Sequence, residues 1–289
     1  MAESPSHKFG QIVGKLLEDI MQPVLHKFCD SRGLYLDIQG ERKGVRNGKK
    51  VTWQDKFGNN HDLDFVIEKN GSQDSRGRPV AFIEAAWRRY TKHSKNKAQE
   101  IQGAVLPIAE GFFWDKPFLG AVLAGEFTQN SLDQLESVGF NLLYFSYESV
   151  VEAFEKSVGI NARFDESTAD EEFQNCIDEI EALSESDRIK LKEYLINEKK
   201  KLFDNFVEKL ASVLDRVIDV LLVVPLYGEE QEFSSISDAV KYIGNFDEAG
   251  GGGEFRKYEI IVKYSNGDKI DASFNTKRKA EEFLKYLGS

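Results

Sequence analysis

HDLDFVIEK (residues 61–69) and VAFIEAAWRRYTKHSKNK (residues 80–97) are the two segments that decide the fold. Each contains an apolar, strand-like run, and the intervening KNGSQDSRGRP has the Gly, Asn, Ser and Pro residues of a turn. We therefore predict a β-hairpin in which Asp64 stands on the first strand and Glu84 ends the buried second strand. The two carboxylates can then meet at one edge of a sheet.

This acidic pair, Asp64 and Glu84, is expected to bind a metal. An acid among buried apolar residues costs free energy unless it is paired or holds a metal ion, and carboxylate oxygens suit Mg²⁺, or Mn²⁺ in its place. Between Arg76 and Lys97 there are seven Lys or Arg residues and one acid, Glu84 itself. Cations can hold phosphates while a metal polarises one of them, so the pattern favours phosphodiester hydrolysis. A salt-bridged strand end and a solvated cationic helix start are the alternatives.

The flanking periodicity predicts an α/β (α+β) domain over residues 1–160, with a mixed central β-sheet flanked by helices. A basic, glycine-containing loop occupies residues 40–50. The expected helices cover residues 8–29, 95–108, 131–136 and 147–156, and the expected strands cover residues 34–38, 51–57, 63–68, 80–85, 118–123 and 141–145.

Over roughly residues 8–145 the chain resembles the PD-(D/E)XK nuclease superfamily, the restriction-endonuclease-like group. That family has an acid on a hairpin strand, a variable turn, then Glu-x-Lys on the next strand, and often a Glu on an N-terminal helix. Asp64, Glu84 and Glu18 match the acids. The resemblance implies a Mg²⁺-dependent endonuclease that cleaves double-stranded DNA in restriction or anti-phage defence, with these three acids at the metal.

The lysine of the family motif is replaced by Ala86 in this chain. Members of the superfamily relocate this lysine to the following helix, so the resemblance implies that Lys92, Lys95 or Lys97 supplies the catalytic cation. The residues expected to contact nucleic acid are Arg88, Arg89, His93 and Gln99. A catalytically inactive nuclease fold, which binds DNA or assembles a defence or repair complex, is the alternative function.

The C-terminal half has a different composition. Residues 161–215 predict an acidic helical connector, since residues 165–187 contain ten acids and no Lys or Arg. Residues 216–289 contain a weak repeat, because residues 233–243 align without gaps on residues 274–284. We predict two β-hairpin–helix units there, through which the chain binds a second copy of itself or a partner protein.

Charge and composition limit the other possibilities. Residues 1–159 hold 20 Lys and Arg against 21 Asp and Glu, whereas the remainder holds 18 against 28, so the nuclease-like part is free to bind DNA despite a net charge of −11. The four scattered histidines and two cysteines form no zinc motif. The N-terminus has no signal-peptide pattern, and no apolar run approaches the ~20 residues that span a bilayer, so a cytoplasmic protein without membrane contact is expected.

Overall fold

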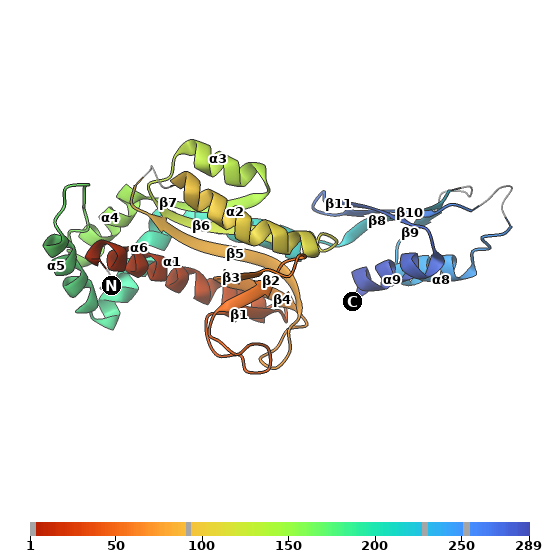
Figure 1. The fold of residues 1–289 in the computed structure, drawn as a ribbon, viewed down its shortest axis with the longest axis horizontal. Coiled ribbons are helices and arrows are strands. Elements are labelled where there is room, and N and C mark those ends of the chain that lie inside the picture. The colour runs from red at the N-terminus through yellow and green to blue at the C-terminus, as the bar shows by residue number, and fades with distance from the viewer. Residues whose placement is uncertain (1–3, 91–93, 227–230, 251–254) are drawn as a thin grey trace. The chain divides into compact units, whose positions relative to one another are not determined.

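The computed structural model describes residues 4–90, 94–226, 231–250 and 255–289, and these divide into a unit ending at Leu210 and a unit beginning at Ala211 (Figure 1). Within these ranges, no helix combines the length and the apolar character required to cross a membrane.

The first unit is built on a five-stranded sheet in the order β1-β4-β5-β6-β7. The β1–β4 and β4–β5 pairs are antiparallel, and β5–β6 and β6–β7 are parallel, so the sheet is mixed. The predicted fold class is confirmed. The strands are β1 (Tyr35–Ile38), β4 (Phe65–Lys69), β5 (Arg78–Arg88), β6 (Phe118–Gly125) and β7 (Phe140–Ser146), while β2 (Val51–Gln54) and β3 (Asn60–Leu63) form a separate hairpin.

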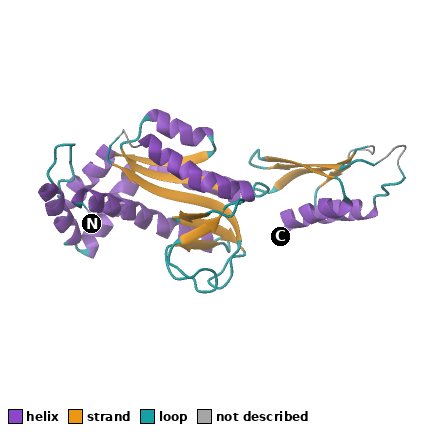
Figure 2. Cartoon of the chain, viewed as in Figure 1, coloured by secondary structure: helices purple, strands orange, loops and turns teal. Residues whose placement is uncertain are grey.

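Helices cover both faces of this sheet (Figure 2). One face carries α1 (Pro5–Asp30) and α4 (Tyr147–Val158), and the other carries α2 (Ser94–Gly111) and α3 (Gln129–Ser137). Side chains of β5 alternate between the two layers, as the period of a strand requires. Phe82 and Ala86 join the core beneath α2, whereas Trp87 packs edge-on against Phe9 of α1, with ring centroids 6.1 Å apart.

The acid-rich segment predicted as a solvated connector is helical, but it packs on the first unit instead of lying free. It forms α5 (Asp170–Glu181), α6 (Glu185–Glu198) and the beginning of α7 (Lys200–Leu214). Helix α5 contacts α1 through one apolar stripe, and its acids occupy the outer side. The stripe has helical spacing and consists of Phe173, Cys176, Ile177 and Ile180, all buried. The excess of charge in the sequence concealed this amphipathic pattern.

The second unit is a four-stranded antiparallel sheet in the order β11-β10-β8-β9, with two helices. Its elements are β8 (Ile218–Pro225), β9 (Gln231–Phe233), α8 (Ile236–Asn245), β10 (Tyr258–Tyr264), β11 (Lys269–Phe274) and α9 (Lys277–Gly288). Each copy of the sequence repeat runs from the last residue of a hairpin into the following helix. The two interior alanines, Ala239 and Ala280, are fully buried. The sequence repeat therefore corresponds to a repeat of structure.

Candidate metal centre

The acidic pair lies where strand β5 loses its neighbour on one side. Pairing of β4 with β5 begins at Phe65 opposite Ile83, whereas pairing of β5 with β6 continues to Arg88 opposite Gly125. The strand predicted over residues 63–68 is broken at Asp64, because β3 turns away to pair with β2. Beyond Glu84, one edge of β5 is therefore open to side chains from the helices on both faces.

Asp64 and Glu84 are joined through their backbones across this gap. The N–H of Ala85 donates to Asp64 Oδ2 (2.7 Å), and the N–H of Asp64 donates to Glu84 Oε1 (3.2 Å). Each carboxylate thus accepts, with one oxygen, a hydrogen bond from a backbone N–H that has no acceptor on any neighbouring strand that the structure describes. The other oxygens, Asp64 Oδ1 and Glu84 Oε2, accept no hydrogen bond from any residue in the described ranges. This arrangement holds both side chains in place and keeps one oxygen of each for a ligand.

Both carboxyls are poorly suited to carry a charge without a cation. Burial raises the pKa of Glu84 to about 8, and the neighbouring Asp64 charge adds to the effect. Burial raises the pKa of Asp64 to about 6, with a further contribution from the charge of Glu18. The pair therefore retains a proton more readily than two separate carboxyls in water would. A divalent ion would remove this penalty by replacing the proton, which is the behaviour of a metal site.

Glu18 of α1 faces the same cleft as Asp64. The cleft has a volume of about 590 Å³, and its lining includes Lys15, Glu18, Lys49 and Asp64. Lys15 lies 3.1 Å from Glu18 Oε2, so the helix supplies its own counterion. Within the described ranges, no three carboxylate, imidazole or thiol side chains are already gathered as a metal cluster. Glu18 lines the cleft with Asp64, and its charge contributes to the raised pKa of Asp64, so its predicted place at the metal stays a prediction.

The structure distinguishes among the lysines that the sequence left open. Ala86 is buried beneath α2, on the face of β5 that also carries Glu84. Lys97 projects from α2, and its positive charge counteracts the burial that raises the pKa of both Asp64 and Glu84. Lys95 is exposed on the same helix and is not among the largest influences on the pKa of either carboxyl. The charge of Lys97 thus acts on both acids of the pair, and Lys92 lies outside the described residues.

The residues expected to contact nucleic acid separate onto two faces. Arg88 points toward α2, where its Nη2 lies 3.2 Å from Glu100 Oε2, and Lys97 lies 3.3 Å from the same oxygen. Arg89 points to the opposite face and stacks on Phe173 of α5 at 4.5 Å. Neighbouring residues of a strand must diverge in this way.

Two further predictions concern the start of α2. Gln99 is exposed on this helix, and His93 lies outside the described residues.

No family model, curated protein or solved structure matches this chain. The chemistry of the centre therefore has to be inferred from its own residues.

The donor set fits Mg²⁺, a hard ion that binds one or two carboxylates and keeps several waters. Two residues of the cleft, Lys15 and Lys49, were not predicted as part of the site. The helical spacing of Lys15 and Glu18 placed them side by side, and this signal was available in the sequence. By contrast, no local pattern distinguishes Lys49 from the other cations of the loop that joins β1 to β2.

Proposed function

We propose that the chain is a Mg²⁺-dependent endonuclease that hydrolyses phosphodiester bonds of double-stranded DNA. The observation that supports this function best is the acidic pair itself. Asp64 and Glu84 are held together by two backbone hydrogen bonds at a strand break, with raised pKa values and one free oxygen each. Two adjoining carboxylates without a counterion in contact, one of them buried, are unfavourable for stability alone.

Each residue of the centre has a role that follows from its position. Asp64 and Glu84 would hold the metal, and Glu84 would release its proton to solvent as the ion enters. When bound, Mg²⁺ supplies positive charge for the phosphate and lowers the pKa of a coordinated water. Lys97 would hold a phosphate oxygen or the attacking water, and Glu100, 3.3 Å from its ammonium, would position it. Mn²⁺ would serve in place of Mg²⁺, because it accepts the same ligands.

A second candidate is a nuclease fold that binds DNA or assembles a complex without cleaving. The observation favouring it is that each carboxylate already accepts a backbone N–H, so the pair completes the open edge of β5 even without a metal. The two candidates differ in one measurable property. The endonuclease binds Mg²⁺ through Asp64 and Glu84, whereas in the inactive fold no divalent ion binds there and chelation leaves DNA binding unchanged.

The deciding experiment compares Asp64→Asn and Glu84→Gln with the wild type, and uses Asp62→Asn as a matched control. Asp62 is two residues away but exposed, with Oδ2 2.7 Å from Lys50 and Oδ1 2.7 Å from the hydroxyl of Thr52. We expect plasmid DNA to be cut by the wild type and the control in Mg²⁺, and by neither site variant. Calorimetry should show that the wild type and Asp62→Asn bind Mg²⁺ and that Asp64→Asn and Glu84→Gln do not. Cleavage by either site variant at the wild-type rate would refute the assignment.

Restriction or anti-phage defence is the biological setting that we propose for this activity. Cells that express the wild type should resist phage infection, whereas cells that express Glu84→Gln at the same level should not. Cutting of both strands also requires two sites, since each chain carries one acidic pair. We propose that a second copy or a partner protein binds through the second unit, and sedimentation of the chain with and without residues 211–289 tests this.

A further inference from the structure

The loop that joins β1 to β2, residues 39–50, is rich in cations, and we call it the basic loop. It contains five Lys or Arg residues and one acid, Glu41. The structure divides these cations into two classes. The arginines Arg42 and Arg46 point inward and are buried around the guanidinium, while the lysines Lys43, Lys49 and Lys50 are exposed.

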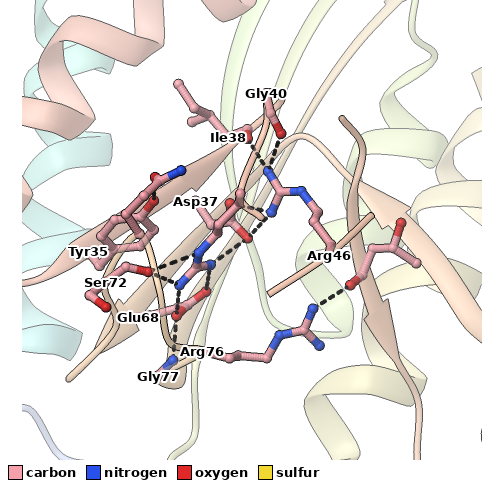
Figure 3. A network of polar contacts seen from close by, with 12 residues as sticks. Tyr35, Asp37, Ile38, Gly40, Arg46, Glu68, Ser72, Arg76 and Gly77 are labelled. Atoms are coloured by element: carbon pink, nitrogen blue, oxygen red, sulfur yellow. Dashed lines mark hydrogen bonds and ion pairs between the residues drawn. The ribbon is translucent and has the colours of Figure 1, made fainter. Parts of the chain in front are cut away.

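Arg42 and Arg46 belong to a buried network with Asp37 and Glu68, which we call the arginine network (Figure 3). Arg42 forms a two-pronged pair with Glu68, with Nη1–Oε1 and Nη2–Oε2 distances of 2.6 and 2.9 Å. It also donates to the carbonyls of Ser72 and Ser75, which lie in the turn between β4 and β5.

Arg46 completes the network on the other side. It contacts both oxygens of Asp37 at 2.6 and 2.7 Å and donates to the carbonyls of Ile38 and Gly40. Two guanidinium groups thus face two carboxylates, so their charges cancel and neither arginine offers its charge to a ligand. Their effect is mechanical, because they attach the basic loop to β1, to β4 and to the hairpin turn.

The loop fixed in this way borders the metal centre. Gln39, Gly40, Glu41 and Lys49 line the cleft that contains Asp64 and Glu18. The N–H of Gly40 donates to the carbonyl of Lys49 at 2.7 Å, which sets the backbone of Lys49 at the rim.

The three lysines of the loop differ in whether their charge is already paired. Lys50 lies 2.7 Å from Asp62, and Lys43 lies 3.6 Å from Glu41. Lys49 forms no ion pair with any residue in the described ranges. It is therefore the loop cation whose charge is available at the cleft.

We propose that the basic loop is a preorganised binding site for a backbone phosphate of the nucleic acid, with Lys49 as its contact. The inference rests on the proposed nuclease function only for the identity of the substrate. The bound phosphate would lie next to the one held at the acidic pair, so the loop fixes the strand along the cleft. A single lysine–phosphate contact weakens with salt and carries no base preference.

The test measures binding without cleavage. Affinity of a short DNA duplex is followed by fluorescence anisotropy in EDTA, over a series of salt concentrations, for the wild type, Lys49→Ala, Lys49→Arg and Lys50→Ala. We expect Lys49→Ala to weaken binding roughly tenfold and to reduce the slope of log affinity against log salt by about one. Lys49→Arg should bind as the wild type does, and Lys50→Ala should lose less than Lys49→Ala.

The controls separate this inference from the nuclease proposal. The Lys49→Ala and Lys50→Ala variants each remove one positive charge, at neighbouring positions. Equal losses of DNA affinity in the two variants would show a diffuse electrostatic attraction and would overturn a specific contact by Lys49. Wild-type affinity in Lys49→Ala, or no DNA binding by the wild type, would also overturn it. Because binding is measured in EDTA, a Lys49-dependent loss supports the loop contact even if Asp64 and Glu84 prove to bind no metal. Thermal melting of each variant confirms that the exposed substitution leaves the fold intact.

Discussion

The arginine network and the acidic pair are two sets of charged side chains at opposite ends of strand β4. Glu68, near the end of the strand, is fully buried and has the Arg42 guanidinium at 2.6 Å. Asp64, just before the strand, and Glu84 beside it have only backbone N–H groups in contact. The arginine network is fully buried and its charges are paired, whereas Glu84 is buried, Asp64 is half-buried at the cleft, and neither has a cation in contact among the described residues. A balanced cluster stabilises structure, whereas an unbalanced one is a place where a ligand ion completes the charge.

The largest effect should come from removing a charge of the acidic pair. In Mg²⁺, Asp64→Asn or Glu84→Gln should lower the cleavage rate by roughly 10³-fold or more, because the metal loses a ligand. Glu68→Gln should leave cleavage per folded molecule within a few-fold of the wild type. Rates measured on supercoiled plasmid, normalised to folded protein, check the contrast. Equal losses in all three variants would erase the distinction between the two clusters.

The next effect concerns stability. Arg42→Met leaves the buried carboxylate of Glu68 without its cation, while Asp37 keeps Arg46, and we expect a loss of about 3–5 kcal/mol in the free energy of unfolding. Lys43→Met removes the neighbouring exposed cation and should cost less than about 0.5 kcal/mol. Urea denaturation in EDTA measures both. A small loss for Arg42→Met would mean that the arginine network does not hold the basic loop.

The pH dependence of stability should differ between the clusters as well. The pKa of Glu84 is raised to about 8 in the folded chain, so the folded state binds a proton that the unfolded state has lost. This contribution is complete below pH ~4.5 and disappears as the pH rises through 8. In EDTA, wild-type stability should fall as the pH rises through this window, and Glu84→Gln should flatten the curve.

Two controls accompany the pH series. At pH 8, an excess of Mg²⁺ should restore the stability of the wild type and leave Glu84→Gln unchanged, since a ligand stabilises the state that binds it. If the wild-type and Glu84→Gln curves stay parallel between pH 4.5 and 8, Glu84 does not carry a raised pKa.

The smallest effect distinguishes two lysines of α2. Lys97→Met should reduce the cleavage rate roughly 100-fold, since it removes a preorganised charge next to the metal. Lys95→Met removes an exposed charge two residues earlier and should change the rate little. Single-turnover kinetics with saturating DNA separates this loss from weaker binding. A larger loss for Lys95→Met than for Lys97→Met would move the catalytic cation to another position on the helix.

Much of the fold follows from local patterns that the sequence shows directly. The nearly continuous apolar run of β5 and the turn residues between β4 and β5 predict the hairpin that brings Asp64 to Glu84. The same patterns wrongly predict that Asp64 lies within a strand and that the acid-rich segment containing α5 is a solvated connector. Asp64 lies in a break between two strands, because β3 pairs with β2 and leaves the main sheet. The apolar stripe of α5 is hidden among acids, and its contact partner α1 lies far away in the sequence.

The sequence by itself determined the sheet-and-helix class, the presence of Asp64 and Glu84 on adjoining segments, and the repeat of the second unit. Only the tertiary structure decided which cation stands beside the acids and which cations are already paired. Local periodicity assigns a side chain to one face of its own element, whereas the partner of a charge depends on how separate elements pack. For that reason the sequence alone does not show that the charge of Lys97 acts on Glu84, that Arg42 is paired with Glu68, or that Lys49 lines the cleft.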